Sequence, residues 1–166
     1  MSDTATAAKT EAKRRSKFLV VVDDTQESRV ALRYATRRAR NIRCGVVLLR
    51  VVEPVDFQQW AGVAEIMRSE AHEAAEGLLQ TLAEQVNKES GLMPELVIRE
   101  GMVREEVLAL IDADPDIRML VLAAAPGGQG PGPLVTALAG QMAGDLSFPI
   151  TVVPGSLTDE QIDRLT

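Results

Sequence analysis

The stretch FLVVVDDTQESRVALRYA, residues 18–35, indicates the fold class and raises the question of function. Its first five residues, Phe18–Val22, are all apolar, which predicts a strand buried on both faces of a sheet. The polar triplet DDT, residues 23–25, ends that strand. Apolar residues then recur at helical spacing from Gln26 to about Ile42. The stretch therefore predicts a strand that turns directly into a helix, with two aspartates at the turn.

The composition indicates one soluble domain with an aliphatic core. The chain has 166 residues, of which 46% are hydrophobic and only 3% are aromatic. The single cysteine, Cys44, and the single histidine, His72, exclude an intrachain disulfide and the common cysteine-histidine zinc sites. No apolar run approaches the roughly 20 residues of a membrane span, and the polar N-terminus does not resemble a signal peptide. We therefore expect a cytoplasmic protein with no resident metal.

The formal net charge of −6 is spread unevenly, with a basic excess in residues 1–50 and an acidic excess after them. Four arginines of the first helix recur every three or four residues, so we expect one solvated basic face: Arg29, Arg33, Arg37 and Arg40. A nucleic-acid binder usually adds a recognisable motif or interleaved aromatic residues. Neither is present, and we predict no nucleic-acid partner and no membrane contact.

Strand and helix patterns alternate along the rest of the chain. Strands are predicted at 18–22, 46–52, 96–99, 119–123 and 150–153, and helices at 26–42, 61–88, 104–111 and 134–146. Alternating βα units predict an open five-stranded parallel sheet with helices on both faces. With the strand order 3-2-1-4-5, ligands bind in the crevice between strands one and four. Those two strands end in Asp23–Asp24 and in a glycine-proline loop, PGGQGPGP, residues 126–133.

The domain is predicted to span residues 17–155. Residues 1–16 are polar and lack apolar periodicity, which predicts a disordered tail. Residues 156–166 predict a short C-terminal helix with a capping box formed by Thr158 and Gln161. Trp60 lies in the loop before the long helix, near the carboxyl ends of the strands, and two roles are open for it: covering the crevice or packing at a partner surface, of which packing is the default.

The long helix at 61–88 carries an apolar stripe at the helical period. We expect this stripe to face the sheet: Val63, Ile66, Met67, Ala71, Ala74, Leu78, Leu82 and Val86.

The acid pair admits three interpretations, of which a magnesium-dependent phosphorylation receiver is the first. A receiver also needs an aspartate after a middle strand and a lysine after the fifth strand. The middle strands end in Glu53 and Glu100, and no lysine follows residue 88. Without that lysine nothing holds an aspartyl phosphate, so we reject this interpretation. The second interpretation is structural: Asp24 or Thr25 caps the first helix, which contributes roughly 1 kcal/mol.

The third interpretation is a nucleotide site. A carboxylate after strand one can accept hydrogen bonds from ribose hydroxyls, and a glycine loop before a helix can approach phosphate. At this point the chain resembles the universal stress protein family. The resemblance runs through VVVDDTQESRVALRYA (20–35), GVVLLRVVEP (45–54), IREGMVREEVLALI (98–111), MLVLAAA (119–125) and FPITVVPG (148–155).

The resemblance implies a fold and a ligand, ATP or another adenine nucleotide. By analogy Asp23 contacts the ribose, the backbone around Val51 contacts the adenine, and Gly127, Gly128 and Gly130 lie nearest the phosphates. The candidate ligand-binding residues are Asp23, Asp24, Thr25, Val51, Gly127, Gly128, Gly130, Gly140 and Gln141.

The family's phosphate loop, G-x2-G-x9-G followed by Ser or Thr, fits this chain in two registers. Matching the glycines selects Gly127, Gly130 and Gly140, with Gln141 at the hydroxyl position, and requires a last helix shorter by about one turn. Matching the flanking strands selects Ala123, Pro126, Thr136 and Ala137 instead. We favour the strand register. Prolines at 126, 131 and 133 also remove backbone donors from any phosphate cradle.

No catalytic constellation is recognisable, and we predict no enzymatic activity. The leading hypothesis is a regulatory, ligand-sensing module of the stress-protein type. The alternatives are a nucleotide-free scaffold of the same fold and a weak ATP hydrolase. We expect a homodimer formed through the last strand and its neighbouring surface, because an exposed edge strand favours pairing. A regulatory protein partner is a further expectation.

Overall fold

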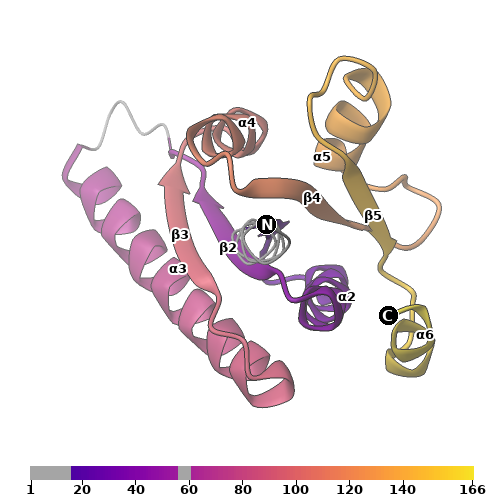
Figure 1. The fold of residues 1–166 in the computed structure, drawn as a ribbon. Coiled ribbons are helices and arrows are strands. Elements are labelled where there is room, and N and C mark those ends of the chain that lie inside the picture. Colours follow the sequence, from indigo (N-terminus) through magenta and orange to yellow (C-terminus); the bar gives the residue numbers. More distant parts are fainter. Residues whose placement is uncertain (1–15, 56–60) are drawn as a thin grey trace, which may run out of the picture.

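The fold is an open parallel sheet, described here from a computed structural model that covers residues 16–55 and 61–166. The predicted tail up to residue 15, and Trp60, lie outside the described residues. The five strands run parallel in the order β3-β2-β1-β4-β5 (Figure 1). Their bounds are Lys17–Val21 (β1), Gly45–Val52 (β2), Glu95–Glu100 (β3), Ile117–Ala124 (β4) and Ile150–Pro154 (β5). The predicted fold class and strand order are confirmed.

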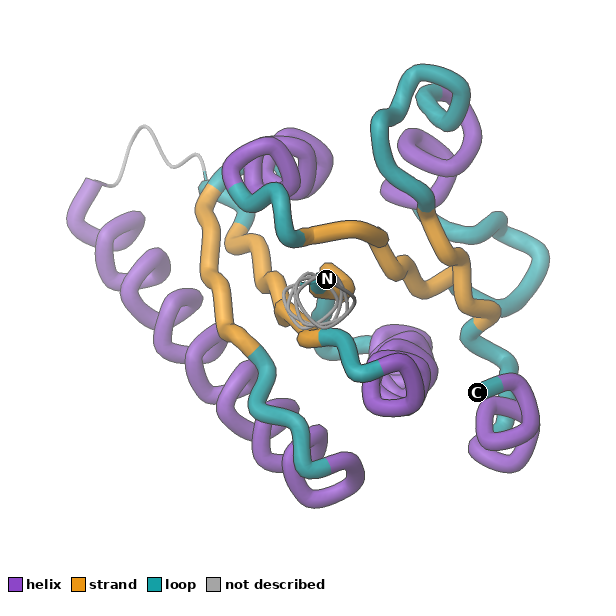
Figure 2. The backbone as a smooth tube through the Cα atoms, in the orientation of Figure 1, coloured by secondary structure: helices purple, strands orange, loops and turns teal. Residues whose placement is uncertain are grey.

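Helices cover both faces of the sheet (Figures 1 and 2). One face carries α2 (Gln26–Ile42), α3 (Ala61–Ser90) and α6 (Asp159–Leu165), and the other carries α4 (Val103–Ala113) with α5 (Pro133–Val135) and η1 (Thr136–Gln141). Two apolar cores follow from this arrangement. Phe18 and Val20 of β1 belong to the first core, and Leu19 to the second, because successive strand residues point to opposite faces. Among the helices of the described residues, none combines the length and apolar character needed to cross a membrane.

The first helix begins and ends where the sequence predicts. The Thr25 side chain accepts a hydrogen bond from the backbone N–H of Ser28 at 3.3 Å and so caps the N-terminus of α2. At the other end Arg43 adopts a left-handed conformation with φ of 60° and donates its N–H to Ala39 and Arg40. The Thr25 bond fixes the end of segment 23–25 to the first turn of α2, and the Arg43 bonds end the helix.

The stripe predicted to bury α3 is wrong over the first half of the helix. Val63, Ile66 and Met67 are 47%, 61% and 37% exposed. In Figure 1 the first turns of α3 lie apart from the sheet, beyond β3, so the helical period continues without a surface to pack on. The residues that α3 buries begin at its midpoint: Ala75, Leu79, Leu82 and Val86.

The last helix before β5 is shorter than predicted. Instead of spanning 134–146, the helical segment runs through α5 and η1 and ends at Gln141, with π-type geometry over Thr136–Gln141. The N–H of Met142 reaches back to the carbonyl of Ala137 at 3.0 Å, which is the five-residue spacing of a π-helix. Gly140 and Gly144 disfavour continuation, because glycine gives up more backbone freedom in a helix than other residues.

The C-terminal helix α6 is packed onto the domain. Its predicted capping box is present, since Thr158 and Gln161 exchange side-chain and backbone hydrogen bonds at 2.9 and 3.2 Å. Ile162 is fully buried in the core between the sheet and α2. Ion pairs from Arg33 and Arg37 to Asp163, both at 3.0 Å, hold α6 against α2.

Candidate functional site

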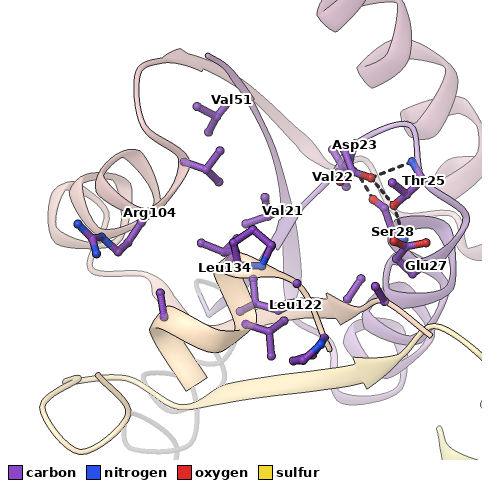
Figure 3. A pocket seen from close by; sticks show the side chains of 18 of the residues that line it. Val21, Val22, Asp23, Thr25, Glu27, Ser28, Val51, Arg104, Leu122 and Leu134 are labelled. Carbon is purple, nitrogen blue, oxygen red and sulfur yellow. Dashed lines mark hydrogen bonds between the residues drawn. The ribbon is translucent and has the colours of Figure 1, made fainter. Parts of the chain in front are cut away.

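A cavity of about 520 Å³ opens at the carboxyl ends of β1, β2 and β4. This is the edge of the sheet where parallel α/β folds bind ligands. Figure 3 shows its apolar interior, to which Val21, Val51, Leu122 and Leu134 contribute. These side chains come from three adjacent strands and from α5. Their arrangement forms a mainly apolar slot that suits a flat, hydrophobic group.

One end of this cavity is polar and is built around Asp23 (Figure 3). The Asp23 Oδ1 atom accepts hydrogen bonds from Thr25, one from the backbone N–H at 2.8 Å and one from the hydroxyl. The Asp23 backbone N–H donates to Ser28 Oγ at 3.0 Å. Within the described residues, Oδ2 of the same carboxylate has no hydrogen-bond partner. The carboxylate is therefore fixed in position and keeps one oxygen available to a donor in the cavity.

Charged side chains at the cavity rim are more often acidic than basic. Four carboxylates line the cavity: Asp23, Glu27, Glu53 and Glu105. Two guanidinium groups line it, those of Arg50 and Arg104. Arg50 also lies 4.0 Å from Asp24, an exposed carboxylate outside this cavity. The surroundings of the cavity therefore favour a neutral or weakly charged ligand over a strong anion.

The glycine loop after β4 turns away from the cavity. The Ala125 N–H donates to the Pro131 carbonyl at 3.1 Å, which closes residues 126–130 into a separate loop. Gly132 then enters the cavity wall with φ of 102°, a conformation that favours glycine, and Pro133 starts α5. As a result, Gly132 lines the cavity wall, a position that the sequence predicts for Gly127, Gly128 and Gly130.

The predicted site residues divide into those at the cavity and those away from it. Asp23, Thr25 and Val51 line it. Five others do not, which corrects their expected placement: Gly127, Gly128, Gly130, Gly140 and Gln141. The glycine register therefore brings none of its residues to the wall, although the helix is shorter as that register requires. The strand register brings two of its four residues there, Ala123 and Ala137.

Sequence comparison matches residues 14–154 to the universal stress protein family. The chain belongs to this family. A curated universal stress protein from Mycolicibacterium smegmatis is 32% identical over 147 residues, which is 83% of this chain and 48% of the relative. The chain thus spans about half the length of the curated relative that it matches.

Solved universal stress proteins share the fold at low sequence identity. UspA from Lactobacillus plantarum superposes with a TM-score of 0.70 at 16% identity, covering 84% of this chain and 98% of that protein. A family member from Arabidopsis thaliana with AMP bound gives 0.59 at 16% identity, covering 87% and 94%. The protein from Archaeoglobus fulgidus in complex with dAMP gives 0.56 at 16% identity, covering 82% and 96%.

In this universal stress protein, Asp24 lines a second cavity rather than the first. This cavity of about 470 Å³ lies between β2 and α3, and Ala74 and Leu78 of α3 form its outer wall. Asp23, Arg50, Val51, Glu53 and Val103 line both cavities. The side chains at the end of β2 therefore separate two adjacent cavities.

Most residues that line the main cavity were not predicted from the sequence, among them Gly132, Glu27 and Arg104. Gly132 precedes the proline that starts α5, but the same Gly-Pro pair occurs at Gly130 and Pro131, so the sequence alone does not single out Gly132. Glu27 and Arg104 each lie in the first turn of a helix that follows a strand, the position that points to the ligand edge of the sheet. Among residues 16–55 and 61–166, no group of three histidine, cysteine or acidic side chains is arranged to hold a metal ion.

Proposed function

We propose that this chain is a ligand-sensing regulatory module that binds an adenine nucleoside or nucleotide in the main cavity. The observation that carries the proposal is the pairing of an apolar slot with the free Oδ2 of Asp23 at one end. An adenosine group has the matching polarity, because its base is flat and its ribose carries hydroxyl donors. Relatives of the same fold that hold AMP and dAMP support this choice of ligand.

The base and ribose have different positions in the proposed complex. The adenine lies between the side chains of Val51, Leu122 and Leu134 and meets backbone polar groups at the end of β2. A ribose hydroxyl donates to Asp23, whose carboxylate is already oriented by Thr25. Such a charge-assisted hydrogen bond is stronger than one between neutral groups.

Regulation rather than catalysis follows from the chemistry at the cavity. Hydrolysis needs a group that activates water and groups that stabilise the developing charge. Among the described residues, no histidine or lysine lines the cavity, and the free Oδ2 of Asp23 is assigned to a ribose hydroxyl rather than to a water molecule. We propose that ligand occupancy is read by a protein partner, and a nucleotide-free scaffold and a weak ATP hydrolase remain the rival functions.

Calorimetric titration of AMP into the purified chain tests the proposal. We expect saturable binding that weakens about tenfold or more in Asp23→Asn, which removes the charge, and in Ala137→Leu, which fills the cavity. Ala109→Leu on the exposed side of α4 is the matched control and retains binding. No binding of any adenine compound would favour the scaffold, and phosphate release above background would favour the hydrolase.

We also propose a homodimer that pairs through β5. This strand is an edge of the sheet, and Val152 is 36% exposed on it. An exposed edge strand offers unpaired backbone groups to a second copy. Light scattering coupled to gel filtration would give a molar mass twice that of one chain. In the Val152→Lys variant the measured mass would fall to that of a single chain. A Val63→Lys control on α3 adds the same charge and leaves the dimer intact.

A further inference from the structure

We infer that the main cavity discriminates against polyphosphates and selects adenosine or AMP over ADP and ATP. This inference rests on the proposed function and specifies its ligand class. The ligand that the fold family implies is ATP, so its adenosine part and its triphosphate must each be compared with the residues present. The apolar slot and Asp23 suit the adenosine, whereas the wall contributed by the chain after β4 does not suit the triphosphate.

The first observation is the shortage of backbone donors in that wall. Pro131 and Pro133 have no N–H groups on either side of Gly132. The Thr136 N–H and hydroxyl both donate to the Gly132 carbonyl, at 3.0 and 2.9 Å, and the Ala125 N–H is bonded to Pro131. Phosphate cradles depend on several converging N–H groups, and this segment offers few.

The second observation is the short α-helical segment that follows. Only Pro133–Val135 is α-helical before the geometry changes to π-type at Thr136. The aligned peptide units continue through η1 but end at Gln141, about two and a half turns after they begin. The N-terminus of this segment therefore combines a short helix dipole with a first residue, Pro133, that has no N–H to offer a phosphate.

The third observation is the sign of the charge around the ribose position. Figure 3 places Glu27 beside the Asp23 end of the cavity and Arg104 at the opposite end. The exposed Asp24 lies 4.0 Å from the second guanidinium, that of Arg50, and offsets part of its charge. Each phosphate added to the ribose therefore brings negative charge into a region that already holds an excess of carboxylates.

Calorimetry with adenosine, AMP, ADP and ATP, each without and with magnesium, tests this inference on the wild-type chain. We expect adenosine and AMP to bind at least about tenfold more tightly than ATP, with ADP between them. Salt gives an independent readout. Because salt screens the repulsion between the carboxylates and the phosphates, we expect a higher ionic strength to strengthen ATP binding. If the cavity held a cationic phosphate site instead, a higher ionic strength would weaken ATP binding.

A charge-removing variant identifies the cause. Glu27→Gln keeps the side-chain shape at the cavity and is expected to tighten ATP binding about threefold or more, while adenosine changes less than about twofold. Glu84→Gln, on the exposed surface of α3, is the matched control and changes the affinity for neither ATP nor adenosine.

The outcomes separate the inference from the proposed function. Binding of ATP as tight as that of adenosine, or ATP binding that weakens with salt, overturns the inference and leaves adenine binding intact. Absence of binding by all four compounds overturns the proposed function, and the inference with it. Tight adenosine, weak ATP and the expected response to salt support both.

Discussion

The Oδ1 atom of Asp23 accepts hydrogen bonds from both the backbone N–H and the hydroxyl of Thr25. Thr25 in turn caps α2 by accepting from the Ser28 N–H at 3.3 Å. The carboxylate that lines the cavity therefore also holds the start of the helix beneath it. The structural interpretation of the acid pair is confirmed for Thr25, with Asp23 Oδ1 supporting the cap, and Oδ2 is the atom available to the proposed ligand.

Substitution of Asp23 separates these two roles. We expect Asp23→Ala to lower the free energy of unfolding by about 1–2 kcal/mol, because it removes the acceptor for Thr25. Asp23→Asn keeps an acceptor oxygen and is expected to lose less than half of that amount. Urea unfolding measures both. Asp24→Ala, an exposed control, should stay within about 0.5 kcal/mol of wild type. Equal losses in the Ala and Asn variants would contradict the hydrogen-bonding role.

Gly155, directly after β5, lies close to the first turn of α2. A Cβ atom added there would lie 2.4 Å from the Glu27 Cβ and 2.8 Å from the Ala124 carbonyl oxygen. We therefore expect Gly155→Ala to destabilise the fold by about 1–3 kcal/mol, as measured by urea or thermal unfolding.

Gly77→Ala is the matched control for Gly155→Ala. Residue 77 is inside α3, and apart from its chain neighbours and the nearby backbone of its own helix, no atom of the described residues lies within 4 Å of the added Cβ. Alanine is favoured over glycine in a helix interior, so this variant should be stabilised by about 0.5–1 kcal/mol. Shifts of the same sign in both variants would show that Gly155 is not restricted by its neighbours.

The strand order and the α2 boundaries could be predicted from the sequence, because they depend on local signals. The apolar run of β1, the Thr25 cap and the helical period each determine one boundary without help from distant residues. The alternation of strands and helices then leaves few topologies, since parallel crossovers are right-handed. Asp23, at the end of β1, was placed at the ligand edge by the same reasoning.

The features that were predicted wrongly depend on tertiary packing. Periodicity alone cannot show that the first half of α3 extends beyond the sheet, where Ile66 is 61% exposed. Glycine spacing cannot show that a hydrogen bond from Ala125 to Pro131 closes the glycine loop away from the cavity. The π-type turn after Val135 follows from hydrogen-bond spacing, which has no signature in the apolar pattern.

Ile162 anchors the C-terminal helix, which lies outside the residues matched to the family. Ile162 is fully buried, and Leu165 of the same helix is 57% exposed. We expect Ile162→Ala to cost about 2–4 kcal/mol of unfolding free energy and Leu165→Ala less than about 0.5 kcal/mol. Amide hydrogen exchange over residues 158–166 should quicken only in the first variant. Equal effects of the two would mean that α6 is held by its ion pairs alone.

Lys17 and Asp114 form an ion pair at the other end of the sheet, with Nζ and Oδ2 2.8 Å apart. The hydrogen bond from Lys17 lowers the pKa of Asp114 below its ordinary value of 3.8, against the opposing effect of burial. Burial acts to lower the pKa of Lys17, but hydrogen bonds to Asp114 and Glu95 outweigh it and raise this pKa above 10.5. The pair therefore stabilises the folded chain throughout the neutral range.

The sign of each shift determines the pH dependence of stability. A lowered carboxyl pKa stabilises the fold above pH 3.8, and this contribution is lost as the pH falls through the folded-state pKa of Asp114. The contribution of Lys17 is complete below pH 10.5 and is lost as the pH rises through its raised pKa. We expect Asp114→Asn to cost about 0.2–1 kcal/mol at pH 7, measured by urea unfolding at a series of pH values.

The difference between wild type and Asp114→Asn should shrink as the pH falls below 3.8, because protonation removes the charge that the substitution removes. Asp112→Asn is the matched control: it lies at the same end of α4, is exposed and makes no ion pair with the described residues. The free energy of unfolding of this control should differ from that of wild type by a constant amount across the acid range. A constant gap between wild type and Asp114→Asn down to low pH would assign the loss to packing, or to the hydrogen bond from the Asp116 N–H to Asp114 at 3.0 Å, rather than to the charge.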